Sequence, residues 1–172
     1  YLQDKYKWVE YHKWNFDFAA YTPLTRGTKQ RAVLQTKANF GFIGNYNRNV
    51  GTGPFERFVL GGTGMSGFGG TGAFLLGQDY IGLRGYDNNS PYLNEFISNN
   101  PTGGIAFTKF TTELRYLVSD MPMATIYGLT FFEAGNNFHS YKEINPYKLY
   151  RSFGAGVRLF MPMFGGLIGF DF

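Results

Sequence analysis

Residues that could carry out chemistry are sparse in this sequence. The chain has two histidines, His12 and His139, and no cysteine. The two histidines stand far apart and lack paired carboxylates beside them, so we expect no metal site. His139 and Ser140 are adjacent, which is not the geometry in which a base activates a nucleophile. The sequence therefore predicts no catalytic site, no metal and no cofactor, and we do not expect an enzyme.

Two further kinds of ligand site are not supported by the sequence pattern. The glycine-rich stretch Phe68–Gly72 could cradle a phosphate only if a strand-to-helix pattern followed it, and none does. We interpret it as a flexible loop. The basic residues are scattered singly along a chain of net charge +4, so we expect no nucleic-acid partner.

The composition is typical of a membrane β-barrel. Aromatic residues make up 20% of the chain and charged residues only 16%, against about 25% charged residues in an ordinary soluble domain. The longest nearly apolar run, Leu159–Phe170, contains Pro162 and is too short for a spanning helix, which needs roughly 20 residues. The mean hydropathy is near zero, at −0.23, as expected when one face of each strand meets lipid and the other a polar lumen.

Alternation of apolar and polar residues predicts the strands that would position any functional side chain. From Arg31 to Ile43, even positions are mostly apolar and odd positions mostly polar, and this length suffices for a tilted strand to cross a membrane. Within the segment Tyr150–Phe160, Gly154 and Gly156 fall on the inward face and would leave room inside the wall. Further strands are predicted over 14–20, 106–116, 125–135 and from about Gly166 to the end.

The connections between these strands alternate in length. Residues 47–104 form one very long insert and 137–147 a medium loop, whereas the connections near 22–29, 118–122 and 162–165 are short. Short periplasmic turns and longer external loops are typical of an outer-membrane barrel. About six strands cannot close around bulky inward residues, so we expect part of a larger barrel. A soluble β-sandwich would explain the alternation, but not strands this long with so many aromatic residues on the apolar face.

Several motifs occur in order along the chain. The long insert contains Pro54–Gly62 (PFERFVLGG) and then Leu83-Arg84-Gly85-Tyr86, followed downstream by Phe131–Asn136 (FFEAGN), Arg151–Val157 (RSFGAGV) and Gly166–Phe172 (GLIGFDF). Together they resemble the BamA family of outer-membrane protein assembly factors. In that family the tetrapeptide V/I/L-R-G-F/Y marks an external loop that folds back into the lumen. The last motif departs mildly, with Gly-Leu-Ile in place of Gly-Pro-Leu.

The resemblance implies how the chain fits into a whole barrel. The strands would be the tenth to fifteenth of about sixteen. Residues 1–172 would then be part of one barrel domain, without the N-terminal POTRA domains, the earlier strands and the last strand. The first and last strands of the family form the lateral gate, which this chain would not contain.

The resemblance also suggests partners for Arg84. In the family, acidic positions matching Glu133 and Asp171 hold the loop arginine. A buried arginine needs anionic partners, and a carboxylate can bind it through two hydrogen bonds. Gly85 would permit a tight turn after Arg84, and Tyr86 would pack on the inner wall. We predict that Arg84 pins the long loop through Glu133, Asp171 or both.

The function implied is assembly and insertion of β-barrel proteins in the bacterial outer membrane. The expected partners are membrane lipids, unfolded outer-membrane protein clients and accessory outer-membrane lipoproteins. Two alternatives stay open: a two-partner secretion or translocation pore of the same superfamily, and a passive porin-like channel. The number of POTRA domains would separate the assembly factor from the secretion pore.

Overall fold

The structure is a computed structural model, and it describes residues 11–25, 30–46, 52–53, 56–62, 78–87, 90, 93, 96–97, 100–101, 103–121, 123–164 and 166–172. The glycine-rich stretch Phe68–Gly72 lies outside the described residues, so its interpretation as a flexible loop stays a prediction. No helix in the described part of the chain is long and apolar enough to cross a membrane.

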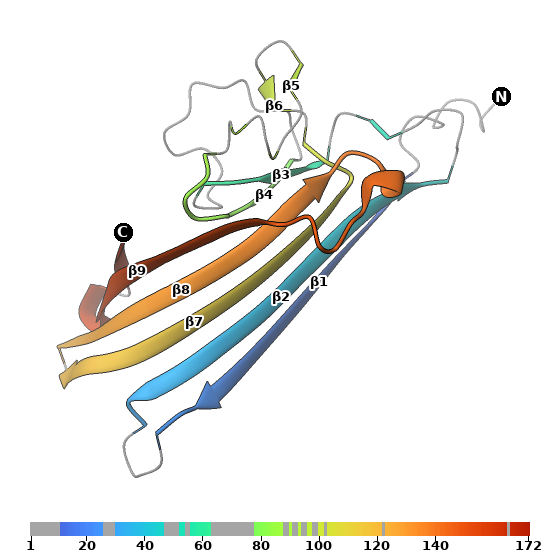
Figure 1. The fold of residues 1–172 in the computed structure, drawn as a ribbon. Helices are drawn as coiled ribbons and strands as arrows, with labels where there is room; N and C mark the ends of the chain where they lie inside the picture. The colour runs from blue at the N-terminus through green and yellow to red at the C-terminus, as the bar shows by residue number, and fades with distance from the viewer. Residues whose placement is uncertain are drawn as a thin grey trace. The chain divides into compact units, whose positions relative to one another are not determined.

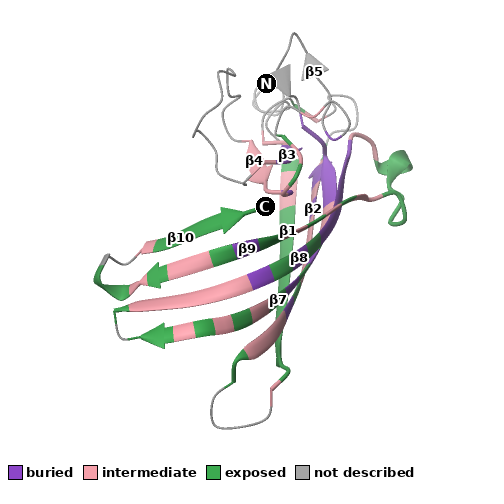
Figure 2. Ribbon diagram, turned by 60° about the vertical axis from the view of Figure 1, so that its left-hand side comes forward, coloured by how far each residue is buried: buried purple, intermediate pink, exposed green. Residues whose placement is uncertain are grey.

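Within the described residues, six strands form one antiparallel sheet in the order β1-β2-β7-β8-β9-β10 (Figures 1 and 2). Their bounds are β1 (Tyr11–Pro23), β2 (Ala32–Asn45), β7 (Ala106–Met121), β8 (Ala124–Phe138), β9 (Tyr150–Met161) and β10 (Gly166–Asp171). The all-β, antiparallel prediction is therefore confirmed. The sheet has β1 and β10 at its edges and is not closed among the described residues, so the closed barrel stays a prediction.

The long connection between β2 and β7 contains short strands of its own. These are β3 (Phe58–Leu60) and β4 (Asp79–Ile81), which pair in parallel, and β5 (Phe96–Ile97) and β6 (Asn100–Pro101), which pair antiparallel. Two short 3-10 helices, η1 (Tyr141–Glu143) and η2 (Pro162–Phe164), lie in the connections that flank β9.

Along β7 and β9 burial alternates, and the apolar side chains lie on the exposed side, which is opposite to the pattern of a soluble protein. On β7, Thr111 and Glu113 are 5% and 7% exposed, whereas Leu114 and Tyr116 are 42% and 50% exposed. Figure 2 shows the same banding on β7 and β9. We call the face that carries Thr111 and Glu113 the polar face and the face that carries Leu114 and Tyr116 the apolar face. Apolar residues on the exposed side suit a strand whose outer face meets lipid.

The strands run further than the alternation predicted. β8 continues to Phe138, although the sequence suggested a loop from Asn137. Asparagine is disfavoured in strands, but side-chain contacts can override that preference. Here the Asn137 amide donates to the Phe58 carbonyl over 2.7 Å, which is a partner that local sequence cannot reveal. β7 likewise continues to Met121, through most of the predicted turn at 118–122.

The chain forms two compact units. The loop unit comprises Tyr1–Asp17, Asn39–Lys109 and Gly135–Tyr150, and so joins the long connection to the adjoining ends of β1, β2, β7 and β8. The strand unit comprises Phe18–Ala38, Phe110–Ala134 and Arg151–Phe172. Each unit is described by itself below.

Candidate functional site

The long loop has an ordered centre built on β3 and β4. Phe58, Val59 and Leu60 pair with Asp79, Tyr80 and Ile81, and all three residues of β3 are fully buried. Gly61 and Gly62 follow with φ of 137° and 59°, a region that glycine enters without steric cost. The chain can therefore leave β3 sharply, and Gly61 N donates to the Ile81 carbonyl over 2.9 Å.

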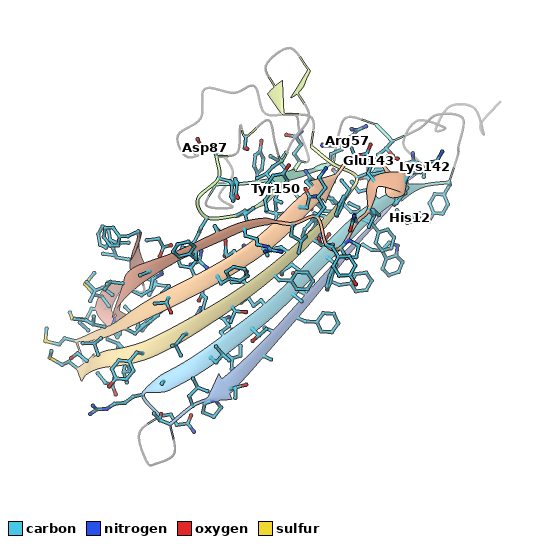
Figure 3. The ribbon with its side chains drawn as sticks, viewed as in Figure 1. His12, Arg57, Asp87, Lys142, Glu143 and Tyr150 are labelled. Atoms are coloured by element: carbon cyan, nitrogen blue, oxygen red, sulfur yellow. The ribbon has the colours of Figure 1, made fainter. Side chains whose placement is uncertain are left out.

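The Leu83-Arg84-Gly85-Tyr86 motif forms a turn directly after β4. Gly85 has φ of 84°, and Tyr86 N donates to the Leu83 carbonyl over 3.3 Å. Leu83 is fully buried in a cluster with Leu60 and Leu93, so the turn is anchored by its first residue. The Tyr86 ring meets the Tyr150 ring edge-on, with centroids 6.1 Å apart; Tyr150 begins β9 (Figure 3). The arginine of the motif is thus carried on a turn whose flanking residues are both packed.

Two glycines of the sheet form the surface against which the loop packs. A Cβ on Gly41 of β2 would lie 2.8 Å from Phe58 Cζ and 2.4 Å from Phe107 Cε1. A Cβ on Gly135 of β8 would lie 3.5 Å from Leu60 Cδ2 and 3.6 Å from a Leu83 Cδ1. The apolar side chains of β3 and of the arginine turn therefore approach the sheet where it has no side chains of its own.

Backbone and amide hydrogen bonds also fasten the loop at Phe58. Phe58 and Gly104 exchange both backbone hydrogen bonds, at 3.0 and 2.7 Å. The Phe58 carbonyl also accepts from the Asn137 amide of β8. Gly103 has φ of 72°, and a Cβ there would lie 2.5 Å from the Phe58 oxygen, so only glycine fits. Phe58 is consequently held by its ring, its N–H and its carbonyl at once.

Two lysines of the sheet donate to the loop. The Lys13 ammonium of β1 lies 2.8 Å from Asp79 Oδ2 and 3.4 Å from Glu56 Oε2, and donates to the Glu56 carbonyl over 2.8 Å. It also lies 4.9 Å from the centre of the Phe58 ring, within range of a cation–π interaction. Lys109 of β7 donates to the Gly82 carbonyl.

The acidic side chains of Glu133 and Asp171 lie on the polar face of the strand unit; Glu133 is buried, whereas the Asp171 side chain is 31% exposed. Glu133 of β8 is 2% exposed and accepts a hydrogen bond of 3.4 Å from the Thr111 hydroxyl. Asp171 of β10 makes a two-point contact with Arg158 of β9, at 2.6 and 2.8 Å. Burying a carboxylate is unfavourable unless cations or hydrogen bonds compensate it, so this face is built to hold positive groups.

Glycines of β9 make room for this face, as the sequence indicated. A Cβ on Gly154 would lie 2.6 Å from the Phe131 ring, and one on Gly156 would lie 2.2 Å from Asp171 Oδ1. The Arg151–Val157 motif therefore shapes the wall on which the carboxylate of Asp171 and the ring of Phe131 rest.

The predicted site residues fall into both units. Leu83, Arg84, Gly85 and Tyr86 belong to the loop unit, whereas Glu133 and Asp171 belong to the strand unit. The pairing of Arg84 with these carboxylates stays a prediction. Sequence reasoning missed Lys13, Gly41, Lys109 and Asn137, which contact the loop directly. Their one shared signal is position, because each occupies the polar-face register of its strand.

Outside the membrane-crossing strands, burial raises the pKa of two tyrosines. In β4 burial raises the pKa of Tyr80, whose hydroxyl lies 3.3 Å from Gln78 Oε1. In η1 burial raises the pKa of Tyr141, whose hydroxyl donates to the Ile43 carbonyl of β2. A tyrosine hydroxyl is already protonated at neutral pH, so each raised pKa extends the pH range over which the hydroxyl can donate.

Comparison with known proteins agrees with this arrangement. The Omp85 superfamily domain matches residues 3–172. No curated protein and no solved structure gave a significant match. Omp85 proteins are outer-membrane β-barrels that assemble proteins in that membrane or translocate them across it. With a match over nearly its whole length, the chain belongs to the Omp85 superfamily.

Proposed function

We propose that this chain is part of the barrel of a BamA-type assembly factor, which folds and inserts β-barrel proteins into the bacterial outer membrane. The observation that carries the proposal is the meeting of three motifs at one point. Leu60 of the PFERFVLGG segment and Leu83 of the arginine turn both lie beside Gly135 of the FFEAGN segment. In the BamA family the same motifs, in the same order, accompany an inward-folded loop.

The proposed activity needs no catalytic group and no cofactor. An unpaired strand in lipid leaves its backbone N–H and C=O groups unsatisfied, at several kcal/mol each. A barrel that offers a strand edge whose N–H and C=O groups can pair with the client strand lowers that barrier. The partners on this view are lipids on the apolar face, unfolded barrel clients and accessory lipoproteins.

Arg84 is proposed to lock the loop in its working position. The Glu133 carboxylate is almost fully buried, and a buried carboxylate needs cations or hydrogen bonds to compensate its charge. We therefore propose that Arg84 binds Glu133, Asp171 or both. Arg84→Ala and Glu133→Gln should both lower assembly, and exchanging the charges in Arg84→Glu with Glu133→Arg should restore part of it. Lys142→Ala, on the exposed helix η1, is the control.

The alternative function is polypeptide secretion or translocation by the same architecture, since the superfamily includes such pores. Depletion of the protein in its own cells separates the two. An assembly factor predicts that other barrel proteins lose their heat-modifiable folded form. If these barrels assemble normally and one soluble protein fails to leave the cell, the assembly proposal is wrong and the secretion pore is favoured. A passive channel predicts neither defect, and ion conductance of the purified protein tests it.

A further inference from the structure

The strand β4 is held at both ends by lysines of the sheet. Asp79, its first residue, contacts Lys13 of β1. Gly82, directly after its last residue Ile81, accepts from Lys109 of β7. The next residue along the chain is Leu83, the first of the arginine turn. The two lysines therefore hold in place the strand that directly precedes the turn containing Arg84.

The Lys13 end is an electrostatic contact. Glu56 and Asp79 place two carboxylates beside one ammonium, and their side chains are 37% and 40% exposed, against 15% for Lys13. Without a cation, these two like charges would repel each other across the start of β3 and β4. Glu56 also has φ of 65°, a left-handed conformation that is unfavourable for a non-glycine residue. Lys13 binds the carbonyl of this same residue, so it stabilises the strained turn as well as the charges.

The Lys109 end includes a hydrogen bond to the backbone, because the Lys109 ammonium donates to the Gly82 carbonyl. A substitution at either lysine therefore removes one end of the attachment of β4.

We propose that Lys13 and Lys109 are positioning residues that clamp β4 to the sheet and so set the place of the arginine turn. This lysine clamp (Lys13 and Lys109) is separate from the proposed binding of Arg84 by carboxylates of the sheet. In the lysine clamp the sheet supplies the cations and the loop supplies the acceptors, whereas Arg84 is a cation of the loop. The inference rests on the proposed function for its biological meaning, since a fixed Arg84 matters only if the docked loop matters.

The test measures how often the loop leaves the sheet. Val59 on β3 is fully buried, and the sequence contains no cysteine. Val59→Cys in the full-length protein therefore gives one reporter thiol in this chain that a membrane-impermeant maleimide reaches only when the loop opens. When closing is fast, the labelling rate follows the opening equilibrium.

Lys13→Met and Lys109→Met should each raise the labelling rate, by about 5- to 30-fold. Lys13→Arg should retain most of the protection. Lys37→Met, which removes a lysine from β2 in the strand unit, should leave the rate unchanged. Raising the salt from about 0.05 M to about 0.5 M should speed labelling of the parent, and this dependence should be weaker in Lys13→Met, which has lost the ion pairs with Glu56 and Asp79.

Two results would overturn the lysine clamp. One is a labelling rate in Lys13→Met and in Asp79→Asn that equals the parent rate. Asp79→Asn lies in the loop and does not perturb a crossing strand, so it still tests the Lys13 contact if Lys13→Met fails to fold. The other is a salt dependence of labelling in Lys13→Met that equals the salt dependence of the parent.

Client assembly, measured separately, distinguishes this inference from the proposed function. Faster labelling with normal assembly upholds the clamp and refutes the role of the docked loop. Unchanged labelling in the clamp variants, combined with failed assembly in Arg84→Ala, refutes the clamp and upholds the function.

Discussion

Gly41→Ala is the sharpest test of how the loop is docked. The new methyl group would lie 2.4 Å from Phe107 Cε1, 2.6 Å from Asn15 Oδ1 and 2.8 Å from Phe58 Cζ. Comfortable carbon–carbon contacts need about 3.5–4.0 Å, so each neighbour must move by roughly 1 Å. Phe107 and Asn15 belong to neighbouring strands of the sheet, whereas Phe58 belongs to the loop. We expect the loop to give way.

The magnitude follows from the overpacking alone, because β2 stays folded whether the loop is docked or open. Overpacking of this kind costs about 1–3 kcal/mol. A cost of about 1–2 kcal/mol to the docked loop corresponds to about 5- to 30-fold more frequent opening.

The assay is maleimide labelling of Val59→Cys in the full-length protein, with Gly128→Ala as the matched control. Gly128 lies on β8, and a Cβ there meets no atom within 4 Å. Gly128→Ala adds a methyl group without a clash, so it should leave the labelling rate unchanged. Combining Gly41→Ala with Phe58→Leu should cost less than the sum of the two single changes, because both act on the same contact. Equal labelling rates in Gly41→Ala and Gly128→Ala would refute the docking of Phe58 on Gly41.

Three further substitutions test separate parts of the structure. Leu114→Arg on the apolar face of β7 should destabilise the folded protein by about 2–4 kcal/mol if this face meets lipid near the bilayer centre, whereas Tyr147→Arg in the exposed connection before β9 should change it little; heat-modifiable migration on gels measures both. Phe58→Ala should release the loop almost completely, because truncating a buried phenylalanine costs about 3–5 kcal/mol, and protease cleavage of the loop reports it; a loop that stays protected would contradict its central role. Tyr141→Phe should lower stability by about 1 kcal/mol at neutral pH. Burial raises the pKa of Tyr141 in the folded protein. The contribution of its hydroxyl to stability is therefore fully present below the pKa of the unfolded chain, about 10, and is lost as the pH rises through the pKa of the folded protein. The urea midpoints of parent and variant should then converge at strongly alkaline pH.

The long strands could be predicted from the sequence because their two faces meet different solvents. The alternation at 106–116 places Thr111 and Glu113 on the same polar face of a strand, and both are buried. Gly154 and Gly156 could also be predicted as spacers. Strand ends were harder, because Asn136 and Asn137 continue β8 only through partners distant in sequence: the Lys148 carbonyl for Asn136 and the Phe58 carbonyl for Asn137.

The contacts of the loop with the sheet could not be predicted either, because they too join residues that are distant in sequence. Lys13 is 43 residues from Glu56, and nothing local distinguishes it from other lysines on a polar face. Gly41 reads as an ordinary strand glycine until Phe58 is placed against it. The arginine turn was found because its motif is short and contiguous, whereas the surface that receives it is assembled from single residues on four strands.

Assembly of client barrels by the purified protein tests the proposed function most directly. Full-length protein and its Arg84→Ala variant are reconstituted separately into liposomes, and a urea-unfolded outer-membrane barrel is diluted onto them. The heat-modifiable folded client is then followed over time, with empty liposomes as the baseline. The proposal predicts folding that is faster than baseline with the parent and close to baseline with Arg84→Ala. Client folding at the baseline rate in the presence of the folded parent would contradict it.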